Sequence, residues 1–322
     1  MKILIVTDAW EPQVNGVVRT LKMTVRELRA RGCEVEIISP QGFRSMPCPT
    51  YPEIRLALTT RRELERRIDA IAPQCVHIAT EGPLGWAVRG ICKKRGWQFT
   101  TAYHSRFPEY LHARFRLPVS LSYSVLRRFH NAGAATLAPT PAIVDDLRSR
   151  GFTQAQIWSR GVDLAMFGVE GEKLPRPSEP IFLYVGRLAV EKQVDAFLAL
   201  DLPGHKWVAG EGPERARLET KYPGVRWFGV LDGPALAKLY RTADVMVFPS
   251  LTDTFGLVMV EAMACGTPVA AFPVPGPVDV VGQSPGGVLH EDLRVACLKA
   301  LELPREGVRR HAEQFSWAAA TE

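Results

Sequence analysis

Residues 248–271 read FPSLTDTFGLVMVEAMACGTPVAA and form the most informative stretch of this chain. An apolar run that ends at Phe248 predicts a buried strand, and a loop rich in Ser, Thr and Asp follows it. The pattern then predicts a helix that begins near Phe255. Asp253 and Glu261 are eight residues apart, a little over two helical turns, so both carboxylates can lie on one side of this element.

This strand–loop–helix unit is suited to binding a nucleotide sugar. The helix N-terminus would leave unpaired backbone N–H groups that fit a diphosphate, at Thr254, Phe255, Gly256, Leu257 and Val258. Glu261 would then accept hydrogen bonds from a vicinal diol such as a ribose. The alternative is an ordinary capped helix, in which Thr252 and Asp253 are caps and Glu261 lies on a solvated face.

The segment resembles the acidic-x7-acidic signature of the retaining glycosyltransferases of family 4. These enzymes have the GT-B fold, an α/β architecture of two Rossmann-like domains that face each other across a cleft. In the family both acidic positions are usually Glu; the first contacts the donor sugar and the second the ribose. The first position here is Asp253, one methylene shorter, which leaves the preferred sugar open.

Three further strings, HIATEGPLG, RFPEYL and TDTFGLV, resemble one branch of that family. The branch contains sulfoquinovosyl and glucosyl diacylglycerol synthases and GDP-mannose-dependent α-mannosyltransferases. The resemblance covers nearly the whole chain. It implies a hexosyltransferase that uses a nucleoside-diphosphate sugar.

Length and composition fit a globular protein of two domains. The chain has 322 residues, of which 46% are hydrophobic and 23% charged, and no apolar run reaches the length of a membrane span. The first ten residues, MKILIVTDAW, indicate a strand rather than a signal peptide. Six scattered cysteines without CxxC spacing favour a reduced, cytoplasmic, metal-free protein with buried thiols.

Charge is uneven along the chain. Residues 1–165 contain 24 Lys and Arg against 14 Asp and Glu, or +10, and the remainder has 16 against 20, or −4. A basic first domain suggests contact with phosphates, nucleic acid or an anionic membrane surface. No helix-turn-helix, zinc or RNA-binding signature accompanies the charge, so nucleic acid is not an expected partner.

Strand-like and helix-like segments alternate throughout, which indicates parallel sheets covered by helices. The expected strands include 135–138, 181–185 and 245–248, and the expected helices include one over 189–200. A stretch rich in Gly, Pro, Glu and Ser at 168–180 reads as a linker. We therefore expect an acceptor-binding domain over 1–167 and a donor-binding domain over 168–304. Residues 305–322 resemble the start of the last GT-B helix and are expected to pack back on the first domain.

The segment FLYVGRLAVEKQVDAF places Arg187 and Lys192 just after a buried strand. In family 4 the matching cations neutralise the donor diphosphate and stabilise the leaving group. Glycosyl transfer builds negative charge on the departing phosphate oxygen, which supports that role. Two surface cations near a helix start are the alternative interpretation.

Other positions are assigned through the same resemblance. Gly16 belongs to a first-domain loop beside the donor phosphate, and His104, which follows a strand, matches a residue that contacts the donor sugar. Arg187, Lys192, Asp253 and His104 thus form the expected catalytic set. The loop Gly210, Glu211, Gly212 matches the one that flanks the nucleotide base. Asp163 is interpreted as structural and Glu81 as a helix cap.

A segment over residues 106–128 mixes basic, aromatic and apolar residues. Basic amphipathic helices with aromatic anchors lie in membrane interfaces, although a helix packed on the core with solvated cations gives the same pattern. The candidate contacts with an acceptor or a membrane are Arg106, Arg114, Arg116, Arg127 and Arg128.

Together these features predict retaining transfer of a hexose, from UDP-glucose or GDP-mannose type donors, to a lipid hydroxyl such as that of diacylglycerol. No metal or other cofactor is expected. The location would be cytoplasmic, with a peripheral position at the inner face of the membrane. A nucleotide-sugar epimerase of GT-B fold and a non-catalytic two-domain sugar-binding protein are the alternatives.

Overall fold

A computed structural model describes residues 1–48 and 51–322, with only the backbone given at 51–53 and 114. The chain divides into two compact units, Met1–Ser159 with Thr321–Glu322, and Arg160–Ala320. This division falls eight residues before the boundary expected after residue 167. Residues 305–320 also differ from expectation, because they belong to the second unit. There, Arg309 donates hydrogen bonds to the carbonyls of Phe167 and Ala264 at 2.9 and 2.7 Å.

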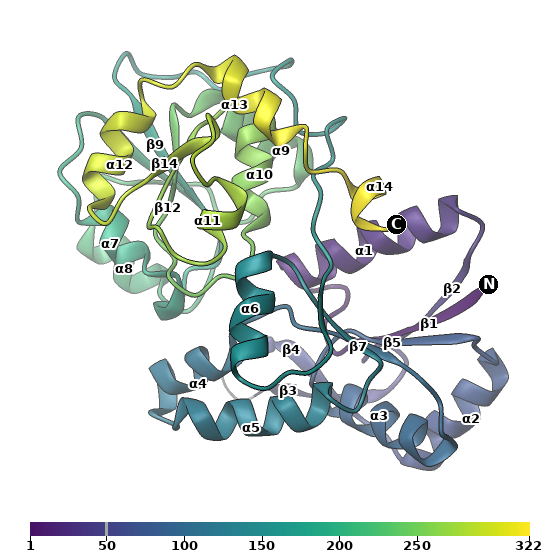
Figure 1. The fold of residues 1–322 in the computed structure, drawn as a ribbon. Coiled ribbons are helices and arrows are strands. Elements are labelled where there is room, and N and C mark those ends of the chain that lie inside the picture. The colour runs from purple at the N-terminus through teal and green to yellow at the C-terminus, as the bar shows by residue number, and fades with distance from the viewer. Residues whose placement is uncertain (49–50) are drawn as a thin grey trace. The chain divides into compact units, whose positions relative to one another are not determined.

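The first unit is built on a parallel six-stranded sheet in the order β2-β1-β5-β6-β7-β8 (Figure 1). Its strands are β1 (Lys2–Val6), β2 (Glu34–Ile38), β5 (Cys75–Ile78), β6 (Thr100–Ala102), β7 (Ala135–Ala138) and β8 (Ala155–Ile157). Its helices are α1 (Gly16–Ala30), α2 (Arg61–Ile71), α3 (Pro83–Arg95), α4 (Phe107–Phe115), α5 (Val119–His130) and α6 (Pro141–Ser149). An antiparallel pair, β3 (Arg44–Cys48) and β4 (Tyr51–Leu58), was not expected from the sequence.

Strand β1 shows why helices cover both faces of this sheet. Its side chains alternate between the faces, and those on both sides are buried. Leu4 and Val6 join a core cluster with α2 and α3, whereas Ile3 and Ile5 join one with α1. The near-continuous apolar run of β1 is therefore the mark of a central parallel strand.

The second unit repeats this plan with a parallel sheet in the order β11-β10-β9-β12-β13-β14. Its strands are β9 (Ile181–Val185), β10 (His205–Ala209), β11 (Arg226–Trp227), β12 (Val245–Phe248), β13 (Val269–Ala271) and β14 (Gly287–Leu289). Its longer helices are α8 (Arg215–Lys221), α9 (Gly233–Thr242), α10 (Leu257–Ala264), α12 (Leu293–Ala300) and α13 (Arg305–Ala312). The short helical segments are η1 (Val190–Lys192), α7 (Val194–Leu198), α11 (Pro277–Val280) and α14 (Trp317–Ala320).

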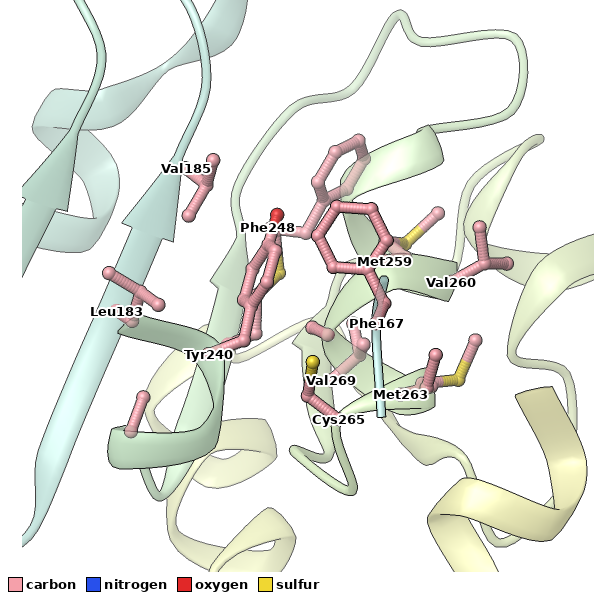
Figure 2. Packing of buried hydrophobic residues seen from close by; sticks show 14 of the residues in the cluster. Phe167, Leu183, Val185, Tyr240, Phe248, Met259, Val260, Met263, Cys265 and Val269 are labelled. Atoms are coloured by element: carbon pink, nitrogen blue, oxygen red, sulfur yellow. The ribbon is translucent and has the colours of Figure 1, made fainter. Parts of the chain in front are cut away.

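Alternation along β9 again separates two buried layers. Leu183 and Val185 face a cluster that includes α9, α10 and α13, whereas Phe182 and Tyr184 face one that includes α7, α8 and α12. Figure 2 shows the first cluster, with labelled side chains from β9, α9 and α10. Apart from Glu261, helix α10 is apolar on all sides because it is a core element, and this packing fixes the position of its N-terminus.

The two sheets share one topological feature. In each, the chain runs outward from a central strand and then returns to that strand's other side. This switch point lies between β1 and β5 in the first sheet and between β9 and β12 in the second. In open α/β sheets, ligands bind outside the carboxyl ends of the strands at such points.

Candidate functional site

The switch point of the second sheet brings Lys192 and Asp253 together. Lys192 ends η1, in the connection after β9, and Asp253 lies in the loop after β12. The ammonium group of Lys192 forms an ion pair with Oδ1 of Asp253. Their side chains are 20% and 17% exposed, so the pair lies partly shielded from water.

The local backbone explains how Lys192 reaches this position. The sequence predicted one helix over 189–200, but the structure has the 3-10 turn η1 and then the short helix α7. Gln193 separates the two with a left-handed backbone, at φ +49°. A continuous helix would carry Lys192 along the helix surface, whereas the break keeps it at the sheet edge.

Asp253 keeps one oxygen available. Its Oδ2 atom is buried and has no hydrogen-bond partner among the described residues. A buried carboxylate oxygen without a partner is unfavourable, so a ligand hydroxyl that donates to it would be stabilised. The loop that contains Gly276 covers this residue: a Cβ at Gly276 would lie 2.8 Å from the carbonyl oxygen of Asp253.

Helix α10 begins at Leu257, two residues after the predicted start near Phe255, and follows Gly256 at φ +86°. Its N-cap residue, Gly256, has no side chain that could cap the helix. Asp253 is paired with Lys192, and the Thr252 hydroxyl donates to the carbonyl of Glu191 at 3.4 Å. The alternative in which these residues cap the helix is therefore wrong. Five residues at this N-terminus, two of them buried (Thr254 and Phe255), remain predicted donor contacts: Thr254, Phe255, Gly256, Leu257 and Val258.

Glu261 does not lie on a solvated face, because only 2% of the residue is exposed. The hydroxyl of Tyr240, on α9, donates to its Oε2 at 3.3 Å. Glu261 thus has a partner inside the protein, and its contact with a ribose stays a prediction.

The loops that follow β9 and β10 are tightly joined. Leu188 donates its backbone N–H to the carbonyl of Glu211 at 2.9 Å, and a Cβ on Gly210 would lie 1.9 Å from the carbonyl oxygen of Gly186. Glycine is therefore required at 210, where φ is +135°. The Tyr184 hydroxyl donates to the carbonyl of Arg187 at 2.8 Å, and burial raises the pKa of this tyrosine. These contacts place Arg187 at the same edge as Lys192.

Comparisons with known proteins show the family of this chain. Residues 14–166 match the model of Glycosyltransferase Family 4, and residues 179–302 match that of Glycosyl transferases group 1. A GDP-mannose-dependent alpha-mannosyltransferase of Mycobacterium tuberculosis is 30% identical over 90% of this chain and 83% of that protein. The chain belongs to glycosyltransferase family 4. It is accordingly a hexosyltransferase that uses nucleotide sugars.

A further relative and a solved structure are also similar to this chain. The sulfoquinovosyl transferase SQD2 of Arabidopsis thaliana is 29% identical over 96% of this chain and 69% of that protein. Among solved structures, sucrose-phosphate synthase from Thermosynechococcus elongatus has a TM-score of 0.82 at 21% identity. The match covers 99% of this chain and 96% of the synthase chain. The likeness confirms the GT-B fold for this glycosyltransferase. Family membership also sets aside the non-catalytic sugar-binding alternative.

In the first unit of the glycosyltransferase, Asn15 and Gly16 begin α1. The Asn15 side chain accepts a hydrogen bond from the N–H of Val18 at 3.0 Å and so caps the helix. His104 follows β6, and its ring meets that of Trp158 edge-on with centroids 5.9 Å apart. The contacts of Gly16 and His104 with the donor stay predictions.

The basic residues near α4 and α5 have different surroundings. The side chain of Arg106 is only 14% exposed and lies 3.2 Å from Asp146 and 3.8 Å from Glu109. Those carboxylates already compensate its charge, which argues against a free phosphate-binding role. Arg127 donates to the carbonyl of Arg150 at 3.0 Å. Arg116 and Arg128 are exposed, and the side chain of Arg114 lies outside the described residues.

Asp8 is a residue that the sequence analysis missed. It follows β1 and accepts hydrogen bonds from the N–H of Leu84 and of Gly85, at 3.0 and 3.4 Å. Asp8, not Glu81, therefore caps α3, and the interpretation of Glu81 as a cap is wrong. Burial raises the pKa of Asp8. The sequence did contain a signal for this cap. An acidic residue, Asp8, follows the central strand β1, and Gly82 follows β5 just before α3.

Metal and membrane features can be reported only for the described residues. They contain no group of three or more His, Cys, Asp and Glu side chains that could hold a metal ion. No helix among them is long and apolar enough to cross a membrane. Of the six cysteines, Cys92, Cys265 and Cys297 are buried as expected, whereas Cys75 is exposed.

Proposed function

We propose that this glycosyltransferase transfers a hexose, with retention of anomeric configuration, from a nucleoside-diphosphate sugar to a hydroxyl group of a membrane lipid. The Lys192–Asp253 pair at the β9/β12 switch point carries the donor half of this proposal. A cation and a carboxylate stand side by side there, and helix α10 begins four residues after the carboxylate. A cation and a helix N-terminus suit the diphosphate of a nucleotide sugar, and a carboxylate suits the hydroxyl groups of its sugar.

On donor binding, Lys192 would exchange Asp253 for a phosphate oxygen, and Arg187 would hold the diphosphate through two parallel hydrogen bonds. Asp253 would then accept hydrogen bonds from sugar hydroxyls, including at its unpartnered Oδ2. The N-terminus of α10 would favour the remaining phosphate charge. Glu261 would bind the ribose either after the Tyr240 hydroxyl has moved away or while it keeps its hydrogen bond to the carboxylate.

The transfer would follow a same-face mechanism. The acceptor oxygen forms a bond to the anomeric carbon on the face from which the diphosphate departs. The bond between that carbon and the phosphate oxygen breaks, and the acceptor proton passes to the departing oxygen. Arg187 and Lys192 stabilise the negative charge that develops on this oxygen. Asp253 and Glu261 are both assigned to binding, so no pair of carboxylates is left for double displacement.

A lipid acceptor is supported by exposed apolar side chains on two helices of the first unit. Helix α5 exposes Leu121 and Val125, one turn apart, by 60% and 49%, and the ends of α4 expose Phe107 and Phe115 by 45% and 51%. The exposed Arg116 and Arg128 belong to the same two helices or the turn between them. Apolar side chains beside arginines are suited to an anionic membrane surface. The relative named a sulfoquinovosyl transferase fits a glycolipid product.

The proposal is tested by a donor screen. UDP-glucose, UDP-glucuronate, UDP-galactose and GDP-mannose are each incubated with dioleoylglycerol in mixed micelles, and products are identified by mass. Retention is read from the anomeric proton coupling of the product. We expect one donor to dominate and its rate to persist in EDTA. Loss of activity in EDTA with recovery in magnesium would refute metal independence, and a changed sugar without acceptor would indicate the epimerase alternative.

A further inference from the structure

The switch point of the first sheet also carries two carboxylates. Asp8 follows β1 and Glu81 follows β5, the two strands between which the chain reverses direction. Asp8 is 5% exposed and is engaged by Thr80, Leu84 and Gly85. Its hydrogen bonds account for its position as the cap of α3. The hydrogen bond of Glu81 runs instead to a residue of α5.

Glu81 is instead held by a buried histidine at the end of α5. Nε2 of His130 lies 3.1 Å from Oε1 of Glu81, and Nδ1 lies 2.8 Å from the hydroxyl oxygen of Thr101. A carboxylate accepts, so Nε2 carries a proton and donates it to Glu81. The His130 side chain is completely buried and its ring contacts those of Phe129 and Phe152. The imidazole is thus fixed in one orientation.

His130 and Glu81 differ in their exposure to solvent. The side chain of His130 is 0% exposed and that of Glu81 is 22% exposed. The described residues give Glu81 this single hydrogen bond. A buried imidazole therefore orients a carboxylate that stays partly open to solvent, at the place where an α/β sheet binds its ligand. In the second unit, the corresponding place holds Asp253.

We propose that Glu81 accepts a hydrogen bond from a hydroxyl group of the glycosyl acceptor, and that His130 is its positioning residue. This inference rests on the proposed function, in which the first unit binds a hydroxyl-bearing lipid. It assigns Glu81 to substrate binding, where the sequence suggested only a helix cap. The acceptor must therefore present a hydroxyl donor to the edge of the first sheet.

The test measures acceptor kinetics of Glu81→Gln with dioleoylglycerol in mixed micelles and the donor chosen by the screen. Gln still accepts from His130 but lacks the charge, so we expect the KM for acceptor to rise about tenfold or more, with a smaller change in kcat. Glu81→Asp keeps the charge but shortens the side chain by one methylene, so its KM for acceptor should be intermediate. His130→Gln should raise the same KM without altering the KM for donor.

Glu36→Gln is the matched control, since Glu36 is an exposed carboxylate on β2 of the same unit. It should leave both KM values at the wild-type level. Wild-type acceptor KM in Glu81→Gln, with or without a lower melting temperature, would overturn the inference and leave the proposed function standing. A wild-type enzyme that forms no lipid product with any donor would overturn the proposed function, and this inference with it.

Discussion

Lys192 and Asp253, 61 residues apart in sequence, form an ion pair at the carboxyl edge of the second sheet. Each compensates the charge of the other while no donor is bound, which limits the cost of holding two partly buried ions. In the proposed function, a diphosphate that takes Lys192 would free Asp253 for the sugar. Binding of the two halves of the donor would then be coupled through this salt bridge.

The first prediction concerns Lys192. Lys192→Ala should lower kcat by about 100-fold or more, because it removes a cation that stabilises the departing phosphate. Steady-state kinetics with the best donor measures this. Lys173→Ala removes an exposed lysine of the same unit and serves as the control. A kcat within about twofold of wild type would exclude Lys192 from the site.

A second prediction concerns the buried Glu261. Glu261→Gln should raise the Kd of the nucleoside diphosphate about tenfold, because the ribose loses a charged acceptor. Calorimetric titration of UDP and GDP gives this value. Tyr240→Phe removes the 3.3 Å hydrogen bond to Glu261 without touching the carboxylate. Equal weakening in both variants would mean that Glu261 acts through packing rather than through ribose contact.

The tight loop after β10 gives a third prediction, for stability. Gly210→Ala should lower the free energy of unfolding by about 1–3 kcal/mol, because its Cβ would lie 1.9 Å from the Gly186 carbonyl oxygen. A Cβ at Gly224 would have no neighbouring atom within 4 Å, so Gly224→Ala should be nearly neutral. Urea unfolding compares the two. Similar midpoints for both variants would contradict the close packing of these loops.

A fourth prediction tests the membrane surface on α5. Replacing Leu121 and Val125 together by Ser should weaken binding to phosphatidylglycerol vesicles about tenfold or more, since it removes apolar area available for insertion. Flotation or sedimentation of vesicles reports the bound fraction. Ile157→Ser changes an equally exposed apolar residue on β8, 57% exposed, and should have no effect. Unchanged binding of the double variant would remove α5 from the proposed interface.

Many elements of the fold were predictable because they are local. The strands over 135–138, 181–185 and 245–248 lie where the sequence predicted them. Each is a largely apolar run bounded by polar or turn residues, the pattern of strands buried on both faces. The β3–β4 pair escaped prediction because its strands contain prolines and alternate weakly.

The candidate site was predictable only in part. Two sequence segments pointed to Lys192 and to Asp253 with Glu261. They did not show that Lys192 pairs with Asp253 or that Tyr240 is the partner of Glu261. The interpretation of Glu81 as a cap failed because Asp8, 76 residues from Leu84, reaches across from β1 to cap α3. Such partners are set by which strands lie side by side.

The sequence by itself determined the family, the α/β class and the residue types of the donor site, because apolar periodicity and short motifs are properties of neighbouring residues. Only the tertiary structure decided that Lys192 meets Asp253, that Glu261 is buried and that His130 holds Glu81. These contacts depend on strand order, which brings distant loops to one sheet edge. Strand order is selected by the burial of whole faces, and no local segment encodes it.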